Sequence, residues 1–186
     1  MKLAAPKRPS YAFMKRVFDI FAASALIVLS FPLFILIAIG VKLTSRGPIF
    51  FKSDRVGIGG KRIVFIKFRT MCQDAENKLG DLMEQNEKDG PIFKIKRDPR
   101  ITPFGRFLRK FSLDELPQLF TVLKGDMSMV GPRPPLLREV EQYDARSMRR
   151  LSVKPGITCF WQVMGRSDLS FEEWIDLDLK YIDSMN

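Results

Sequence analysis

Residues 20–41 read IFAASALIVLSFPLFILIAIGV and carry no charged side chain. A helix that crosses a bilayer needs about 20 apolar residues, so this stretch is long enough. Ser30 and Pro32 lie at its middle, however, and a proline removes one helical hydrogen bond and kinks or breaks a helix. The sequence therefore predicts two helices, residues 18–31 and 32–45, each about 21 Å long, with a break at Ser30 and Pro32.

Basic residues flank this apolar stretch on both sides. No acid precedes Asp19, and Asp54 is the only acid among residues 42–62. Lys and Arg favour the cytoplasmic side of a membrane, and neither half-helix alone crosses a hydrocarbon core of ~30 Å. We therefore expect residues 1–45 to form a membrane-inserted re-entrant hairpin. A single straight span, the alternative, would put one basic cluster on the far side.

The positive charge of the chain is concentrated around the apolar stretch. Residues 1–71 contain 13 Lys and Arg against 2 Asp and Glu, whereas residues 72–186 contain 18 against 19. No nucleic-acid-binding motif is present, and anionic lipid head groups attract basic clusters beside an apolar segment. We therefore expect anionic membrane lipids as a partner and no nucleic acid. The apolar run also exceeds the ~7–15 residues of a secretory signal, and no A-x-A cleavage site follows it.

Residues 46–186 are expected to form one cytoplasmic catalytic domain, which makes the fold class α+β and mostly helical. A short β-hairpin is predicted from residues 49–52 and 62–67 around a Gly57–Gly60 turn. Helices are predicted at 74–88, at 104–124 with a break at Ser112 and an end at Gly125, and, as amphipathic surface helices, at 136–151 and 171–182. Residues 131–135, GPRPP, predict an extended loop.

The chain contains no histidine and two cysteines, Cys72 and Cys159. This composition excludes a disulfide framework and a zinc site, and it indicates a thiol-compatible cytoplasmic setting. A general acid or base must then come from another residue type, and carboxylates are the main candidates.

Two adjacent carboxylates occur in residues 109–117, RKFSLDELP. One interpretation is structural, because Ser112 followed by Glu115 matches a helix capping box. The other is catalytic: Asp114 would stay ionised beside free backbone N–H groups, and helix N-termini bind phosphate. Arg109 lies just upstream and could neutralise a diphosphate. An ionised carboxylate, a neighbouring carboxylate and cations suit covalent phosphoryl transfer with a divalent metal.

A third carboxylate, Asp178, lies on the apolar stripe of the helix predicted at 171–182. A buried acid is costly unless it is paired or binds a metal. A salt bridge to a core arginine and a role in the site are both open interpretations.

The ordered motifs of the chain resemble those of the bacterial polyprenyl-phosphate sugar-1-phosphate transferases, the monotopic phosphoglycosyl transferases. The matching stretches are KRVFD (15–19), KFRTM (67–71), SLDELPQL (112–119), GDMS (125–128), VGPRP (130–134), KPGIT (154–158) and QVMGR (162–166). The block from residue 89 to 166 looks closest to members that begin exopolysaccharide or O-antigen units with glucose or galactose.

The resemblance implies a reaction in two steps. The aspartate matching Asp114 displaces UMP from a UDP-hexose and keeps the phospho-sugar, which polyprenyl (undecaprenyl) phosphate then accepts. Glu115 matches the partner carboxylate, associated with Mg²⁺ and proton handling. Arg109 and Arg133 match phosphate-binding and nucleotide-sugar residues. Further candidate phosphate ligands in matching motifs are Lys67, Arg69 and Arg166, and the candidate metal ligands are Asp114, Glu115 and Asp178.

The resemblance also implies a monotopic protein on the cytoplasmic face of the bacterial inner membrane, and it allows a homodimer. Cys159 stands where the family usually has glycine, and family members usually continue beyond the position of Asn186 with another helix. We therefore expect residues 46–186 to lack the family's C-terminal end. A catalytically inert membrane scaffold is the competing hypothesis, and the intact pair of Asp114 and Glu115 argues against it.

Overall fold

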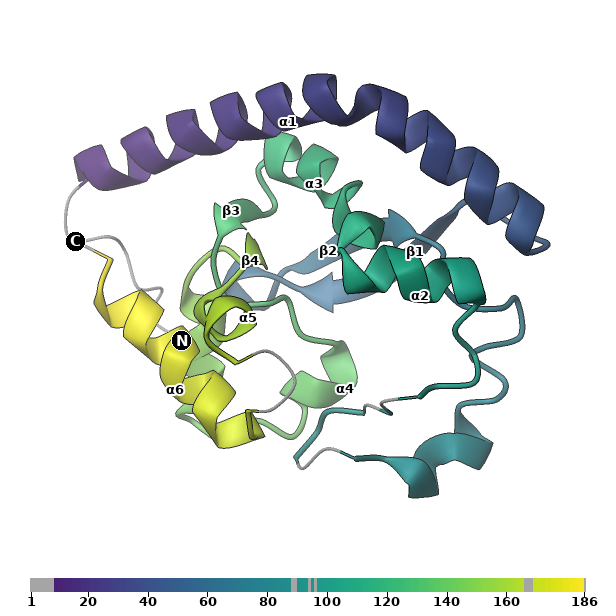
Figure 1. The fold of residues 1–186 in the computed structure, drawn as a ribbon. Helices are drawn as coiled ribbons and strands as arrows, with labels where there is room; N and C mark the ends of the chain where they lie inside the picture. Colours follow the sequence, from purple (N-terminus) through teal and green to yellow (C-terminus); the bar gives the residue numbers. More distant parts are fainter. Residues whose placement is uncertain (1–8, 88–89, 94, 96, 166–168, 186) are drawn as a thin grey trace.

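The computed structural model describes residues 9–87, 90–93, 95, 97–165 and 169–185. A long helix, α1, arches over a smaller domain of short helices and strands (Figure 1). The mixed, mostly helical class expected from the sequence is confirmed.

Helix α1 runs without interruption from Pro9 to Thr44 and contains Pro32. The predicted break into two helices is therefore wrong, although Figure 1 shows that the helix is strongly curved. The hydroxyl of Ser30 donates to the carbonyl of Leu26 at 2.5 Å, as expected for a polar side chain near a proline in an apolar helix. A proline inside a helix removes a hydrogen bond and favours bending, and here it does so without ending the helix.

Contacts on both sides of Pro32 attach α1 to the domain. One apolar cluster joins the first half of α1 to strand β2 (Arg62–Phe68) and helix α3 (Gln118–Lys124): Ala23, Ile27, Ile63, Phe65, Leu119, Val122 and Met127. A second cluster joins the other half to β2 and helix α2 (Pro103–Lys110): Ile37, Val41, Phe68 and Leu108. The outer face of α1 is apolar and exposed, since Phe21, Leu29 and Leu43 are 74%, 77% and 81% accessible to solvent. This is the one described helix that is long and apolar enough to cross a membrane.

Strands β1 (Phe50–Val56) and β2 (Arg62–Phe68) form the predicted antiparallel hairpin. Its turn holds Gly59 and Gly60 at φ of 67° and 84°, a region that glycine adopts at no steric cost. Along β2, Ile63 and Phe65 are buried, and Lys67 lies on the same face because side chains of a strand alternate. The hairpin therefore turns a lysine towards the interior of the domain.

Helices α2 (Pro103–Lys110) and α3 (Gln118–Lys124) occupy the segment predicted as one helix broken at Ser112. Between them lies a 3₁₀ helix, Leu113–Glu115. Helix α3 ends at Gly125, whose φ of 95° is the left-handed conformation expected for a helix stop. The predicted break and end are confirmed.

The rest of the domain is built around a short parallel pair. Strand β3 (Ser128–Val130) pairs with β4 (Gly156–Thr158), and helix α5 (Phe160–Met164) follows β4. Between the two strands the chain forms the expected extended loop, helix α4 (Leu137–Val140) and a 3₁₀ helix, Ser147–Ser152. Helix α6 (Phe171–Asp183) closes the fold and begins with a capping box at Ser170.

Two predicted helices are wrong in part. The segment 74–87 forms turns and a 3₁₀ helix, Gly80–Gln85, and the segment 136–151 is divided into α4, turns and a 3₁₀ helix. Helices of this length take most of their stability from packing an apolar face. In 74–87 the buried apolar residues are Ala75 and Leu82 alone among those described, which is too little to hold a regular helix.

Candidate active site

Asp114 is buried by an unusual turn of the backbone. Ser112 has a φ of 56°, and it is the only non-glycine residue of the described chain with a positive φ. Ser112 separates α2 from the 3₁₀ helix that carries Asp114. Asp114 is 6% exposed. Ser112 makes no side-chain cap bond, so the capping box of the structural interpretation is absent.

Cations surround the buried carboxyl group. Burial raises the pKa of Asp114, and Glu115 raises it further, while Lys67 and Arg109 act in the opposite direction. The pKa of Asp114 lies above its ordinary value because burial outweighs the effect of the two cations. An added negative phosphate would be held by the same cations.

The side chain of Lys67 lies beside Asp114 and comes from β2. Burial lowers its pKa to about 8, and Arg109 contributes in the same direction, while Asp114 raises it. Its ammonium also lies 5.4 Å from the centre of the Phe51 ring on the paired strand. A cation whose charge is disfavoured by burial gains most when an anion arrives beside it.

Arg109 comes from the last turn of α2. Its Nε donates to the hydroxyl of Thr70 at 2.9 Å, which fixes the guanidinium next to the end of β2. Helix and strand approach closely because residue 105 is glycine: a Cβ there would lie 2.1 Å from the carbonyl oxygen of Thr70. Burial lowers the pKa of Arg109, and Asp114 partly compensates.

Arg133, in the loop after β3, completes the set. It donates to Oε1 of Glu115 at 3.1 Å. Burial opposes its charge, but Glu115 holds the pKa of the guanidinium above its ordinary value. Five residues named from the sequence, Lys67, Arg109, Asp114, Glu115 and Arg133, are thus brought together from four separate segments of the chain.

Arg55, which was counted only among the basic flanks in the sequence, also belongs to this cluster. It donates to the carbonyl of Pro134 at 3.3 Å and lies over the Phe65 ring, and its Nε is buried without a hydrogen-bond partner. Burial lowers its pKa to about 10, with a further contribution from Arg133. The alternation of β1 could have indicated it, because Phe51, Ser53 and Arg55 share the less exposed face.

A cavity of about 310 Å³ opens beside these residues. Arg109, Ser112 and Glu115 line one side, and the other side comes from β4 and α5 through Ile157, Thr158, Trp161, Gln162 and Val163. Cys159, between β4 and α5, has a φ of −147°, which any residue adopts, so the position does not require glycine. A cavity with a guanidinium at one wall, and with Ile157, Trp161 and Val163 among the groups at the other, suits a ligand with phosphate and organic parts.

Three residues predicted for the site lie elsewhere or outside the described chain. The guanidinium of Arg69 donates to the carbonyls of Ser45 and Arg46, just after α1, so it holds the end of that helix. Asp178 pairs with Arg150 through bonds of 2.7 Å and is 1% exposed, which agrees with the salt-bridge interpretation. Arg166 lies outside the described residues.

The predicted set of three metal ligands is not assembled. Within the part of the chain that the structure describes, no group of three or more His, Cys, Asp or Glu could hold a metal ion. Asp114 and Glu115 still offer two hard oxygen donors, and Mg²⁺ is commonly held by one or two carboxylates together with substrate phosphates. The two residues fit Mg²⁺ in that shared form, whereas Asp178 does not take part.

A buried carboxylate among cations, beside a cavity, is an arrangement that can hold a phosphorylated ligand. A family model described as bacterial sugar transferase matches residues 10–186, and this chain belongs to that family, as its motifs indicated.

Named relatives agree with this assignment. The chain is 51% identical to the galactosyl transferase CpsE of Streptococcus agalactiae over 137 residues, 73% of this chain and 30% of CpsE. It is 40% identical to the exopolysaccharide production protein ExoY of Rhizobium meliloti over 179 residues, 94% of this chain and 79% of ExoY. It is 43% identical to the undecaprenyl-phosphate galactose phosphotransferase of Salmonella typhimurium over 181 residues, 93% of this chain and 37% of that protein. The chain thus spans about a third of the length of CpsE and of the Salmonella phosphotransferase.

Proposed function

We propose that this protein transfers a hexose-1-phosphate from a UDP-sugar to polyprenyl phosphate, with Asp114 as the nucleophile. The observation that carries the proposal is the burial of one carboxylate between Lys67 and Arg109, next to Glu115 and a cavity. Carboxylates that form covalent phosphoryl intermediates need such neighbouring cations, since attack brings negative charge onto negative charge.

The first step joins Asp114 to the sugar phosphate. A carboxylate oxygen of Asp114 attacks the β-phosphorus of the UDP-sugar, and an O–P bond forms. The bond from that phosphorus to the bridging oxygen breaks, and its electron pair leaves with UMP. Lys67, Arg109 and Arg133 neutralise the phosphate oxygens as charge accumulates there.

The second step releases the sugar phosphate to the lipid. A phosphate oxygen of polyprenyl phosphate attacks the same phosphorus, and the bond to Asp114 breaks to restore the carboxylate. Glu115 takes the proton of the acceptor phosphate if that group arrives protonated. The product is a lipid-linked sugar diphosphate, and no redox partner is required.

Mg²⁺, held by Asp114 and Glu115 with the substrate phosphates, would supply further neutralisation of phosphate charge. The carboxylate of Glu115 lies close enough to Asp114 to raise the pKa of that group, and the bond from Arg133 orients Glu115.

We further propose that α1 enters the cytoplasmic leaflet of the inner membrane and leaves it on the same side. Contacts attach α1 to the domain on both sides of Pro32, and only 11% of its most apolar 18-residue window is buried. Both ends of a helix held in this way stay on the side of the domain. Thiol labelling of Ser10→Cys and Lys52→Cys in intact cells should show both protected from the periplasm, and accessibility of one alone would mean a full span.

For the sugar, glucose or galactose is favoured. CpsE and the Salmonella relative are both named for galactose, which supports a hexose without an N-acetyl group. A relative from Aeromonas hydrophila, 43% identical over 84% of this chain, is named for N-acetylgalactosamine, so the test must include both kinds.

The experiment combines the purified full chain in lipid nanodiscs with polyprenyl phosphate, Mg²⁺ and a panel of UDP-sugars. UMP release should occur with UDP-glucose or UDP-galactose, stop in excess EDTA and return when Mg²⁺ is added. Failure to release UMP from any member of the panel would contradict the proposed reaction, and full activity in EDTA would contradict the metal.

A further inference from the structure

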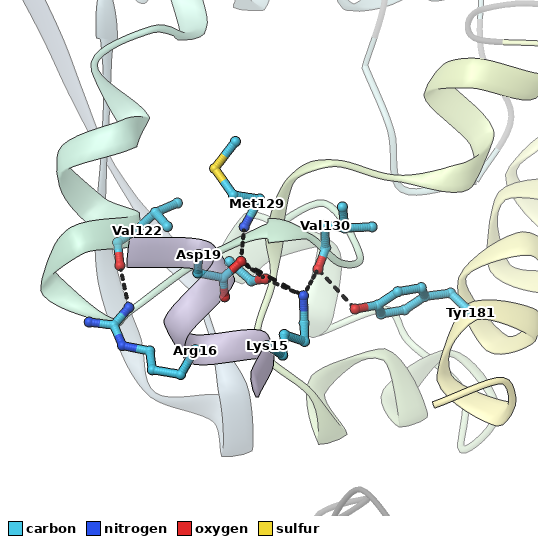
Figure 2. Close-up of polar contacts among 8 residues, drawn as sticks. Lys15, Arg16, Asp19, Val122, Met129, Val130 and Tyr181 are labelled. Atoms are coloured by element: carbon cyan, nitrogen blue, oxygen red, sulfur yellow. Dashed lines mark hydrogen bonds and ion pairs between the residues drawn. The ribbon is translucent and has the colours of Figure 1, made fainter. Parts of the chain in front are cut away.

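Three charged residues in the first half of α1, Lys15, Arg16 and Asp19, make polar contacts with the domain (Figure 2). Asp19 is 3% exposed, and its Oδ1 accepts hydrogen bonds from the hydroxyl of Ser128 at 3.0 Å and the amide of Met129 at 2.9 Å. Lys15 donates to the same hydroxyl at 2.6 Å and to the carbonyl of Val130 at 3.1 Å. Lys15 and Asp19 together therefore contact every residue of strand β3.

Arg16, beside them, makes a separate attachment. Its two terminal nitrogens donate to the carbonyls of Val122 and Leu123, both at 2.7 Å, in the last turn of α3. Arg16 thus holds α1 to a helix, whereas Lys15 and Asp19 hold α1 to a strand (Figure 2).

Strand β3 leads directly to the site. The amide of Gly131, next after β3, donates to Thr158 at 3.0 Å, and the amide of Gly156 donates to the carbonyl of Pro132 at 2.9 Å. Thr158 is part of the cavity wall, and Arg133 follows Pro132 and bonds Glu115. The position of β3 consequently sets both a wall of the cavity and the loop that presents Arg133.

The pair of β3 and β4 alone gives weak support to the cavity wall and to the loop that presents Arg133. β3 and β4 have three residues each and pair in parallel, the slightly less stable arrangement per residue. Apolar contacts would be enough to attach α1, and buried charges are an expensive way to do so unless they fix a particular register. Tyr181 of α6 also donates to the carbonyl of Val130 at 2.9 Å, so β3 is held from both sides.

We propose that Lys15 and Asp19 are positioning residues, through which the seating of the membrane helix α1 sets the register of β3 and thereby the placement of Arg133. The ligand affected is the nucleotide diphosphate, and this part rests on the proposed function. Lipid around α1 and nucleotide affinity in the cavity are then linked through four hydrogen bonds to one strand.

The test compares Lys15→Met and Asp19→Asn with Arg16→Met, a matched control that loosens α1 without touching β3. In lipid nanodiscs the first two should raise the KM for the UDP-hexose and the Kd of UDP by about tenfold, because small displacements of a binding group have large effects. Arg16→Met should change both by less than about threefold at the same folded fraction. Equal effects in all three variants would overturn the proposal.

Hydrogen exchange separates this inference from the proposed function. The amide of Gly131 should exchange faster in Lys15→Met and Asp19→Asn than in wild type, and at the wild-type rate in Arg16→Met. If wild type releases no UMP, the proposed function fails, yet the exchange rates still decide whether α1 supports β3. If the charge variants do not fold, Ser128→Ala removes only the shared hydroxyl, and an unchanged Gly131 exchange rate in that variant would overturn the proposal.

Discussion

The guanidinium of Arg133 donates to the carboxylate of Glu115 at 3.1 Å and so joins the loop after β3 to the 3₁₀ helix that carries Asp114. This bond takes the place of the capping box that the spacing of Ser112 and Glu115 suggested. Glu115 is turned towards the guanidinium of Arg133 instead of back to its own helix. The neighbouring carboxylate is thereby kept available at the site.

Replacing Arg133 by Lys should lower kcat/KM for the UDP-sugar by about tenfold or more, because a lysine cannot reproduce the planar fork of a guanidinium. The loss should fall mainly on KM. Arg149→Lys, at an exposed arginine paired with Asp183, is the control and should have wild-type kinetics. An Arg133→Lys enzyme with unchanged KM would show that this guanidinium does not contact the donor.

Lys67 should determine the alkaline limb of the pH profile. Since burial lowers its pKa to about 8, the free enzyme loses this charge above about pH 8, and kcat/KM should fall there. Lys67→Arg should move the limb to higher pH because arginine stays protonated. Lys52→Arg, at an exposed lysine of β1, is the control and should leave the alkaline limb in place. If Lys67→Arg does not move the limb, a group other than Lys67 causes it.

Deprotonation of Lys67, which lowers kcat/KM, should raise the free energy of unfolding. Between about pH 8 and 10.5 the unfolded chain keeps a proton that the folded chain has lost. The free energy of unfolding contributed by Lys67 therefore rises with pH in that window. Activity and stability should thus change in opposite directions there.

The sequence predicted the elements whose signals are local. The β-hairpin follows from two β-prone segments around glycines, and the interruption at Ser112 and the end at Gly125 follow from turn chemistry. The adjacent pair Asp114 and Glu115 could be named because they are neighbours in the chain. Lys67 and Arg133 could be named only through matching motifs, since nothing local brings them to Asp114.

Long-range contacts explain what the sequence did not predict. Helix α1 continues through Pro32 because the domain packs against it on both sides of that residue. Alternation alone would place Arg69 on the same face as Lys67, but β2 ends at Phe68, and the guanidinium of Arg69 binds the carbonyls of Ser45 and Arg46 after α1 instead. Arg55 was missed because its role depends on a loop almost eighty residues away.

Ser112 is predicted to be a strained position. A non-glycine residue in the left-handed region costs about 1–2 kcal/mol, most for a β-branched side chain. Ser112→Val should therefore lower the free energy of unfolding by about 1–2 kcal/mol relative to Ser112→Gly, measured by thermal or denaturant unfolding. Ser53→Val, in strand β1, should not be destabilising, and equal stability of the two Ser112 variants would contradict the strain.

Asp178 is predicted to act in stability and not in metal binding. Burial raises its pKa, and Arg150 opposes that rise, so the charged pair depends on both partners. Asp178→Asn leaves a buried guanidinium unpaired and should cost about 3 kcal/mol, whereas Asp183→Asn, in an exposed pair, should cost less than about 1 kcal/mol. The Mg²⁺ concentration for half-maximal activity should not change; a large increase in Asp178→Asn would return this residue to the metal site.

The central claim, covalent catalysis by Asp114, is tested most directly by the intact mass of the protein after incubation with a UDP-hexose and Mg²⁺ but without polyprenyl phosphate. The account predicts one added hexose phosphate per chain, about one equivalent of UMP, removal of the adduct when polyprenyl phosphate is supplied, and no adduct in Asp114→Asn. UMP release that requires the acceptor and leaves the mass of an active protein unchanged, or an adduct that persists in Asp114→Asn, would contradict it.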